Sequence, residues 1–427
     1  MRVLVLGGGG REHALVACLA GDPAVSTLVC APGNPGIARL ARTVPVDLAS
    51  VDAVAALADR ERIDLAVVGP ELPLSLGVAD RFAAEGRRLF GPTAAAARLE
   101  SSKAFAKAFM ARHRIPTARF QTCDSLDEAL SVIREGRLGF PLVLKADGLA
   151  AGKGVVIADD RAAAEAAAVA AMATRAFGPA GDRLVLEECL VGPEVSFFAV
   201  CDGARAVPIG TAQDHKRIFD DDRGPNTGGM GAFAPSPLVD GSLEAEIMRD
   251  VVAPVIAGMA MEGHPFRGFL YAGLMLTATG PKVIEFNVRL GDPEAQVILP
   301  LIDEPLLPIL VAGATGALSQ SSVRLRPGCL TGVVMASRGY PDAVESGQAI
   351  TGMERAEASP GVAVRHAATA MRESQLVAAG GRVLTVVGSG ATFAESTARA
   401  YAGVRLISFD GMQYRTDIGR KAVSAVS

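Results

Sequence analysis

The sequence has few cysteines, and they do not cluster. Its six cysteines lie at scattered positions, and no two of them form a C-x-x-C motif. A structural zinc site needs such clustering, and a disulfide framework is typical of short secreted chains rich in cysteine. The sequence therefore predicts reduced thiols in a cytoplasmic protein.

The sequence also lacks a long apolar run and a cleavable leader. The longest stretch without charge, residues 305–323, contains two prolines and ends in polar residues, so it does not predict a membrane span. The N-terminus passes from a short apolar run directly into glycines and charged residues, unlike the apolar region and cleavage site of a signal peptide. We expect no membrane partner.

A strong excess of charge is absent as well. The chain has 42 Lys and Arg against 46 Asp and Glu, which gives a formal net charge of −4, and no basic stripe is present. Nucleic acid is therefore not an expected partner. A chain of 427 residues with 50% hydrophobic composition has room for about two to four domains with substantial cores.

The N-terminal part of the chain alternates between strand and helix patterns. Apolar runs in VLVLG, STLVCAPG and DLAVVG predict strands, and REHALVACLA and VDAVAALADRERI predict helices between them. This alternation predicts a doubly wound parallel sheet, in which ligands bind beyond the carboxyl ends of the strands. Two strand ends carry the motifs GGGGRE and VGPE, so we expect a ligand site in this unit, residues 1–100.

The rest of the chain predicts further units of mixed structure. Residues 101–122 have the pattern of a connector helix, with serines at its start that would cap it. Residues 123–193 contain strand patterns and one alanine-rich helix, and residues 194–325 contain further strands and helices. Residues 326–427 have the pattern of a smaller α+β domain. The predicted fold class is therefore α/β and α+β, in several domains.

An acid, an amide and a guanidinium share one face of the strand pattern KVIEFNVRL. Glu285, Asn287 and Arg289 alternate with apolar residues, as in a half-buried strand. A solvated face with a chance mixture of charges explains this pattern equally well. The alternative is a metal and phosphate site, because Mg²⁺ takes few protein oxygen ligands and a guanidinium binds phosphate oxygens.

The glycines after the first strand do not complete a dinucleotide-binding fingerprint. In the template G-x-G-x-x-G the third glycine would fall on Glu12, and no obvious acidic residue ends the second strand. The N–H groups of Gly8, Gly9 and Gly10, at the start of a helix, would instead form an anion site. A tight turn that binds nothing is the alternative.

A second glycine-rich segment, DGLAAGKGV, is similar to a P-loop but does not match it. Three residues, rather than four, separate Gly148 from Gly152, and Gly154 stands where a Ser or Thr would bind Mg²⁺. We interpret the segment as a hairpin that closes over nucleotide phosphates, with Lys153 and Lys145 as point charges. An ordinary loose hairpin is the alternative.

Two further segments are rich in polar residues. The strand pattern LVLEE ends in Glu187 and Glu188, where a strand edge could bind adenine, although simple surface acidity explains these residues better when they are taken alone. The segment QDHKR, which includes His215, precedes the glycine-rich GPNTGGMGAF. A single histidine is more typical of a core or a surface, but the whole cluster indicates an active-site loop.

These motifs occur in one order along the chain, together with APGN, FGPT, SKAF, FLYAGLM, GGRVL and DIG. In this order they resemble the phosphoribosylamine–glycine ligase (glycinamide ribonucleotide synthetase) family. The resemblance implies an N-terminal α/β domain, a two-lobed ATP-grasp module and a small C-terminal α+β domain. It also implies that ATP joins glycine to 5-phosphoribosylamine through glycyl phosphate, as a step of de novo purine biosynthesis.

The resemblance also implies roles for individual residues. The residues expected to hold ATP are the phosphate ligands Lys103, Lys145, Gly152, Lys153 and Gly154, the adenine ligands Glu187 and Glu188, and the ribose ligand Glu194. Mg²⁺ or Mn²⁺ is expected on Glu285 and Asn287. The residues expected to bind substrate are Gly8, Gly9, Gly10, Arg11, Glu12, Glu71, Asn226, Thr227, Gly228, Gly229 and Met230. The expected catalytic residues are Arg289, Lys216 and two candidates for the amine's proton, Asp214 and Asp292.

Three positions depart from the family pattern. The family usually has an aromatic residue at Leu290, a glycine at Ala368 and a lysine at Thr416. Two other functions stay open: an ATP-grasp ligase for a different acid or amine, and a nucleotide-binding protein without catalysis. QDHKR and GPNTGGMGA argue against the first, and the intact lysine and metal positions argue against the second. The family pattern leads us to expect a monomer.

Overall fold

Five strands form the parallel sheet of the N-terminal unit, in the order β3-β2-β1-β4-β5. The computed structural model describes residues 1–148 and 154–425. The strands are β1 (Arg2–Gly7), β2 (Thr27–Pro32), β3 (Arg42–Thr43), β4 (Leu65–Val68) and β5 (Leu89–Phe90). The helices are α1 (Gly10–Ala20), α2 (Val51–Arg60), α3 (Glu71–Ser75) and α4 (Val78–Ala84). The strand order reverses between β1 and β4, and the motifs GGGGRE and VGPE follow these two strands, as predicted for a ligand-binding edge.

The connector is a corner between two helices. Helix α5 (Ala94–Ser101) ends where α6 (Lys103–Arg112) begins. Between them Ser102 caps α6, because its hydroxyl accepts a hydrogen bond from the Phe105 N–H at 3.1 Å. The predicted serine cap is therefore confirmed, and it falls at the point where the chain leaves the N-terminal unit.

A small lobe follows, with a four-stranded antiparallel sheet in the order β6-β9-β7-β8. Its elements are β6 (Phe120–Cys123), α7 (Leu126–Glu135), β7 (Leu142–Ala146), β8 (Val155–Ala158), α8 (Arg161–Met172) and β9 (Leu184–Glu188). The sequence predicted only one helix here, α8. Helix α7 was missed although its signal is present, because Leu126, Ala129 and Ile133 recur at helical spacing and Ser125 caps the helix.

The large lobe and the C-terminal domain share one sheet of eight strands, in the order β16-β15-β10-β11-β14-β17-β21-β18. The strands are β10 (Glu194–Asp202), β11 (Ala206–Asp214), β14 (Gly231–Ala234), β15 (Arg267–Thr277), β16 (Gly280–Asn287), β17 (Cys329–Ala336), β18 (Val362–His366) and β21 (Arg382–Gly390). The C-terminal domain therefore continues the sheet through the β14–β17 pair and is fixed relative to the loops that enter β14.

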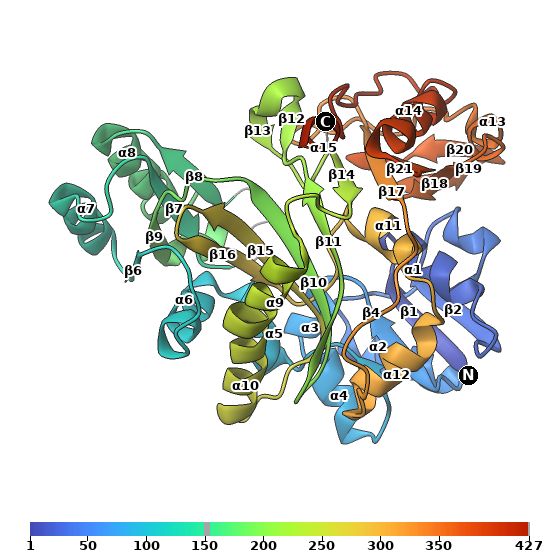
Figure 1. The fold of residues 1–427 in the computed structure, drawn as a ribbon, viewed down its shortest axis with the longest axis horizontal. Helices are drawn as coiled ribbons and strands as arrows, with labels where there is room; N and C mark the ends of the chain where they lie inside the picture. Colours follow the sequence, from blue (N-terminus) through green and yellow to red (C-terminus); the bar gives the residue numbers. More distant parts are fainter. Residues whose placement is uncertain (149–153, 426–427) are drawn as a thin grey trace.

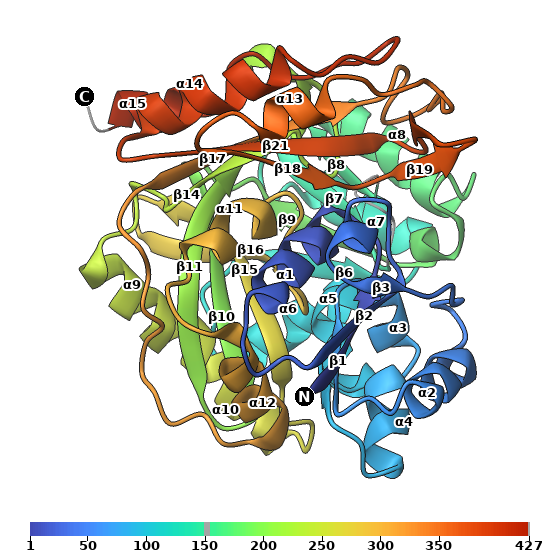
Figure 2. The same cartoon turned by 90° about the vertical axis from the view of Figure 1, so that its right-hand side faces the viewer.

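Two small hairpins and a set of helices complete the fold. The hairpins are β12 (Arg217–Phe219) with β13 (Arg223–Asn226), and β19 (Thr369–Arg372) with β20 (Gln375–Ala378). The helices are α9 (Gly241–Ile247), α10 (Ala253–Met261), α11 (Ala295–Ile298), α12 (Leu306–Thr315), α13 (Met353–Glu357), α14 (Phe393–Val404) and α15 (Arg420–Ala425). In Figure 1 the small lobe projects at one side of the molecule, and Figure 2 shows the C-terminal strands and α14 lying across one end.

The strand that carries Glu285 is shorter than the sequence pattern predicts. Strand β16 ends at Asn287, so Arg289 lies beyond it. The register with β15 shifts so that Ile284 has no opposite residue, which is the geometry of a β-bulge. Because the bulge precedes Glu285, Glu285 and Asn287 still share one face of the strand.

The hydrophobic cores show how the units are joined. The small lobe has its own core, which includes Ile133 and Leu186, whereas Leu4 of β1 and Phe197 of β10 belong to one cluster. The N-terminal unit and the large lobe therefore pack as one continuous body beside the separate small lobe. All six cysteines are free thiols, as predicted. Within the described residues, every helix is too short or too polar to cross a membrane.

Candidate active site

The predicted metal ligands, Glu285 and Asn287, lie at the C-terminal end of β16. Burial pushes the pKa of Glu285 up, but the charges of Lys216, Lys145 and Lys103 hold it below its ordinary value, so the carboxylate is ionised at neutral pH. A carboxylate and an amide are oxygen donors that suit Mg²⁺ or Mn²⁺ together with phosphate oxygens and water. In the described part of the chain, no three His, Cys, Asp or Glu side chains gather as a metal cluster. The two residues fit a metal that takes few protein ligands.

The amide of Asn287 is oriented by a residue that the sequence did not indicate. Two hydrogen-bond acceptors face one side of this amide, so its nitrogen is assigned to that side. The nitrogen then lies 3.1 Å from the Phe286 carbonyl oxygen and 3.2 Å from the Glu100 carboxylate. The Val288 N–H donates to the same carboxylate at 2.8 Å. Glu100, at the end of α5, therefore holds the end of β16 and turns the amide oxygen of Asn287 away from itself.

Lys145 is held in a buried group of charges. Its ammonium lies 3.0 Å from the Glu187 carboxylate and donates to the carbonyl of Ile284, the bulge residue, at 3.0 Å. Glu187 also pairs with Lys107 at 2.7 Å. The Glu187 carboxylate is therefore buried between two lysines, and the predicted place of Glu187 at the adenine stays a prediction. Burial lowers the pKa of Lys107 to about 8 although Glu187 opposes the shift.

Lys103 binds the start of the second glycine-rich segment. Its ammonium donates to the Gly148 carbonyl at 2.8 Å. The adjacent Ser102 hydroxyl and Ala104 N–H donate to Asp147 at 3.0 Å and 3.1 Å. The N-terminus of α6 therefore fixes the point where the segment leaves β7.

The rest of that segment lies mostly outside the described residues. Gly152 and Lys153 belong to the undescribed stretch, so their predicted phosphate contacts stay predictions. Gly154 is described, and its carbonyl accepts a hydrogen bond from the Ala146 N–H at 2.8 Å, directly before β8. The segment therefore joins two antiparallel strands, as the sequence predicted, and not a strand and a helix.

The other two predicted ATP carboxylates take part in ion pairs. Glu188 lies 2.6 Å from Arg119 and 3.6 Å from Lys282, on the opposite face of β9 from Glu187. Glu194, at the start of β10, lies 2.9 Å from Lys216 and is 45% exposed. Glu194 is therefore accessible to a ligand, and its role at the ribose stays a prediction.

Arg289 is half-buried between two carboxylates of the N-terminal unit. Its guanidinium lies 2.8 Å from Glu100 and 3.3 Å from Glu71. Burial would lower its pKa, but these two acids raise it above its ordinary value. Glu71 was predicted to meet phosphoribosylamine; its carboxylate contacts Arg289, and the substrate contact stays a prediction. The contact links the VGPE strand end to the end of β16.

Asp214 and Lys216 lie among several acids at the end of β11. Burial raises the pKa of Asp214 to about 7, and the charges of Glu294 and Glu194 add to the shift. Lys216 has a pKa well above its ordinary value, because Asp214 and other neighbouring acids outweigh its burial. A carboxyl group that titrates near neutral pH can accept and release a proton during turnover.

His215, between these two residues, is a core histidine. It is buried, and neither ring nitrogen has a hydrogen-bond partner in the described residues. Burial lowers its pKa to about 4, with Arg415 and Lys421 adding to the shift, so the ring is neutral at pH 7. Its ring packs edge-on against Phe233, with centroids 5.9 Å apart.

The helix start after β1 is already occupied by acids of the chain. The Gly9 N–H donates to Glu12 at 2.6 Å, and Arg11 donates to the same carboxylate at 2.6 Å. The Asp292 carboxylate lies over the same turn, since a Cβ added to Gly9 or Gly10 would come within 3.4 Å or 3.6 Å of it. The prediction that these N–H groups are free is therefore wrong for Gly9.

The loop between β13 and β14 closes on Lys216. The Thr227 N–H and hydroxyl both donate to the Lys216 carbonyl at 2.8 Å. Gly229 has φ +112°, and a Cβ there would lie 2.5 Å from Pro293, so this position requires glycine. Met230 was predicted to bind substrate; it is fully buried in a small cluster with Ile218, and its role stays a prediction.

Two residues of the C-terminal domain fix this loop. The Gly228 N–H donates to the Tyr340 hydroxyl at 2.9 Å. Arg382 donates to the carbonyls of Gly228 and Asp292, at 2.5 Å each. Arg382 thus ties the GPNTGG loop to the LGDPE loop. The only signal for it in the sequence was the motif GGRVL, which is weak evidence by itself.

Comparison with protein families covers most of the chain. The model described as "Phosphoribosylglycinamide synthetase, N domain" matches residues 1–100, the ATP-grasp (A) domain matches residues 101–295, and the C domain matches residues 330–421. The chain belongs to the phosphoribosylglycinamide synthetase family. The predicted architecture, with an N-terminal parallel sheet, an ATP-grasp module and a small C-terminal domain, is confirmed.

Individual relatives agree with the family. The chain is 48% identical to the phosphoribosylamine–glycine ligase of Xylella fastidiosa strain Temecula1, over 99% of this chain and 98% of the relative. It is 49% identical to that of Mesorhizobium japonicum, over 99% of each chain. The crystal structure of phosphoribosylamine–glycine ligase from Thermotoga maritima is 35% identical, with a TM-score of 0.85 over 98% of this chain and 100% of that one.

A more distant structure shares the fold alone. The biotin carboxylase domain of Hydrogenobacter thermophilus 2-oxoglutarate carboxylase, in complex with MgADP, has a TM-score of 0.72 at 17% identity, over 97% of this chain and 91% of that one.

The three departures from the family pattern have clear places in the structure. Leu290 is a buried core residue. Ala368 lies beside Gly380, where an added Cβ would come within 2.8 Å of its methyl group. The Thr416 N–H and hydroxyl both donate to the Asp220 carboxylate. Thr416 therefore binds the tip of the β12–β13 hairpin, so the C-terminal domain keeps a contact with the site loops at this position.

Proposed function

We propose that this chain joins glycine to 5-phosphoribosylamine with the conversion of ATP to ADP and phosphate, and so forms glycinamide ribonucleotide. The main support is that the charges of Lys216, Lys145 and Lys103 outweigh the burial of Glu285 on β16 and keep its pKa below the ordinary value. Three cations near one metal-binding carboxylate suit a nucleoside triphosphate, whose phosphates the cations would bind, together with its metal ion. The names of the relatives support the same reaction. We also propose Mg²⁺ or Mn²⁺ as the metal and a cytoplasmic monomer as the working form.

The first step is proposed to be phosphoryl transfer to glycine. A carboxylate oxygen of glycine attacks the γ-phosphorus in line, the bond to the bridging oxygen breaks, and ADP leaves. Lys145 and Lys103 neutralise phosphate charge, and Arg289 donates to the transferring group with the N–H groups that its two acids leave free. A metal on Glu285 and Asn287 would supply further charge neutralisation at the phosphates.

The second step is proposed to be attack by the amine of phosphoribosylamine. Its nitrogen forms a bond to the carbonyl carbon of glycyl phosphate, and phosphate leaves with one oxygen that came from glycine. Asp214 takes the proton that the nitrogen loses. The support for Asp214 over Asp292 is its pKa of about 7, because burial of Asp292 is outweighed by Arg382 and Arg11, which hold its pKa below the ordinary value. A base works best when its pKa is near the working pH.

The test is ADP release from ATP and Mg²⁺, measured with glycine, with freshly made phosphoribosylamine, and with both. The proposal predicts release that requires both substrates, and a product with the mass of glycinamide ribonucleotide. Release without either substrate, or only with a different acid or amine, would contradict it and would move the function to another ATP-grasp reaction.

A further inference from the structure

The β12–β13 hairpin joins the two polar motifs of the site. Lys216 immediately precedes the hairpin, and Asn226 ends it. The Thr227 N–H and hydroxyl close its base through their bonds to the Lys216 carbonyl. Any movement of the hairpin therefore moves the backbone that carries Lys216.

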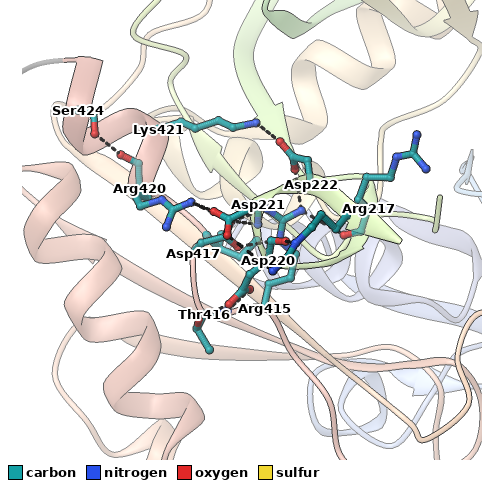
Figure 3. Close-up of polar contacts among 12 residues, drawn as sticks. Arg217, Asp220, Asp221, Asp222, Arg415, Thr416, Asp417, Arg420, Lys421 and Ser424 are labelled. Atoms are coloured by element: carbon teal, nitrogen blue, oxygen red, sulfur yellow. Dashed lines mark hydrogen bonds and ion pairs between the residues drawn. The ribbon is translucent and has the colours of Figure 1, made fainter. Parts of the chain in front are cut away.

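The tip of this hairpin has an unfavourable backbone conformation. Asp221 and Asp222 have φ of 59° and 52°, values that residues other than glycine rarely adopt. Two such residues in succession persist only where surrounding contacts hold them. The contacts here come from the C-terminal segment, residues 415–421 (Figure 3).

Exposed ion pairs form the outer part of this contact. Lys421 lies 2.6 Å from Asp222, and Arg420 pairs with Asp221. Both cations are more than half exposed. Pairs of this kind contribute little to stability, typically less than about 1 kcal/mol each. They alone do not explain how the strained tip is held.

Arg415 forms the buried centre of the contact. Its side chain is 0% exposed. Its Nε and Nη2 atoms each donate to Asp417 at 2.7 Å, and Nη1 donates to Asp222 at 2.8 Å and to the Arg217 carbonyl at 3.1 Å. Each nitrogen of the guanidinium therefore has an acceptor.

The bond to the Arg217 carbonyl is the functional link. Arg217 directly follows Lys216 in the chain, so Arg415 fixes the peptide next to the residue whose ammonium faces Glu194 and Asp214. Asp222 fixes the far end of the same hairpin on the same guanidinium. One buried side chain thus sets both ends of the element that carries Lys216.

We propose that Arg415 is a positioning residue for catalysis, which holds the β12–β13 hairpin so that Lys216 keeps its place among the acids of the site. The proposal rests on the ligase reaction proposed above. Arg415 acts only through the hairpin, and the Lys216 ammonium is the group that its loss displaces.

The first variant is Arg415→Lys, which keeps the charge. One ammonium cannot bind both Asp417 oxygens and the Arg217 carbonyl with the geometry of the guanidinium. We expect kcat to fall about tenfold to a hundredfold, as for a small misplacement of a catalytic group, with little change in KM for ATP. The matched control is Arg338→Lys, an exposed arginine of the same domain that pairs with Asp410 at 3.2 Å, and it should keep wild-type kcat.

A double-mutant cycle with Lys216→Met tests the route of the effect. If Arg415 acts through Lys216, adding Arg415→Lys to Lys216→Met lowers kcat by less than about twofold further. Losses that add fully, or an Arg415→Lys variant with wild-type kcat, would overturn the proposal.

Hydrogen exchange gives a reading that does not depend on activity. In Arg415→Lys the Asp221 and Thr227 amides should exchange faster, while amides of the β17–β21 pair keep their protection. Unchanged exchange at these two amides would overturn the positioning role even if the chain proves to have another activity. If Arg415→Lys does not fold, Asp222→Asn tests the same points, because Asp222 is 41% exposed and its loss frees the same hairpin. A wild-type chain that forms no glycinamide ribonucleotide would instead overturn the proposed function.

Discussion

Two cations at the β12–β13 hairpin, Lys216 and Arg415, differ in exposure and in how fully their charges are paired. At the base, Lys216 is 32% exposed and lies among several acids, and the pKa of Asp214 rises to about 7 because of its burial, with the charges of Glu294 and Glu194 adding to the shift. Arg415, which binds Asp222 at the tip and the Arg217 carbonyl at the base, is 0% exposed and each of its nitrogens has an acceptor. Unbalanced charge that shifts pKa values is typical of a place where a ligand or proton arrives, whereas fully paired charge is typical of support. Variants at the two kinds of position should therefore separate activity from stability.

The largest expected effect is at Glu285. Glu285→Ala removes the ionised oxygen ligand of the proposed metal pair, so Mg²⁺-dependent turnover should fall by at least about 10³-fold while the chain still folds. Steady-state kinetics and a thermal unfolding curve measure the two quantities. Glu354→Ala, at an exposed glutamate of α13, is the control. Unaltered activity of Glu285→Ala would contradict the assignment of Glu285 as a metal ligand.

Arg289 should show the next largest effect. Arg289→Ala should lower kcat by about 10²- to 10³-fold, as for the loss of one donor to a transition state, with a much smaller rise in KM for ATP. The variant also leaves Glu100 buried without its cation, so the double variant Arg289→Ala/Glu100→Gln controls for instability. An equal loss in kcat and in affinity for ATP would count against a transition-state role.

The two lysines that pair with Glu187 sharpen the comparison. Lys107→Met removes a supporting cation at 2% exposure, and it should lower the free energy of unfolding by about 1–3 kcal/mol with little change in KM for ATP. Lys145→Met should instead raise KM for ATP at least about tenfold, because it removes a proposed phosphate ligand. Urea unfolding and ATP titration distinguish them. If both variants weaken ATP binding equally, the assignment of Lys145 to the ATP site and of Lys107 to structural support is wrong.

The smallest expected effect is a change in the pH dependence of stability at His215. The folded-state pKa of about 4 lies below the ordinary 6.5, so the unfolded chain binds more protons between these values. Stability from this residue is therefore present above pH 6.5 and is lost as pH falls toward 4. Between these pH values, His215→Leu should reduce the slope of the free energy of unfolding against pH by up to about 1.4 kcal/mol per pH unit. Equal slopes for wild type and variant, in urea unfolding at several pH values, would contradict the buried neutral ring.

The sequence could predict features that depend on near neighbours. An apolar run predicted β1, the alternation of strand and helix patterns predicted its sheet, and spacing by two predicted that Glu285 and Asn287 share a face. The QDHKR motif placed Asp214 and Lys216 together because they are two residues apart. In each case a short stretch of backbone determines the geometry.

Features that depend on distant pairs could not be predicted in the same way. Glu100 meets Val288 across 188 positions, and Arg415 meets Arg217 across 198. Nothing local shows which of many acids will pair with a buried arginine. The pairing of Glu187 with Lys107 and Lys145 is likewise a tertiary contact that no local pattern indicates.

The most direct test of the mechanism is the fate of the glycine oxygens. Glycine labelled with ¹⁸O in both carboxylate oxygens would be turned over with ATP, Mg²⁺ and phosphoribosylamine, and the phosphate and glycinamide ribonucleotide would be analysed by mass spectrometry. Because phosphate leaves with the oxygen that attacked the γ-phosphorus, the account predicts one ¹⁸O in each phosphate and one in each product amide. Phosphate without the label would contradict glycyl phosphate as the intermediate, and with it the central role assigned to the residues around β16.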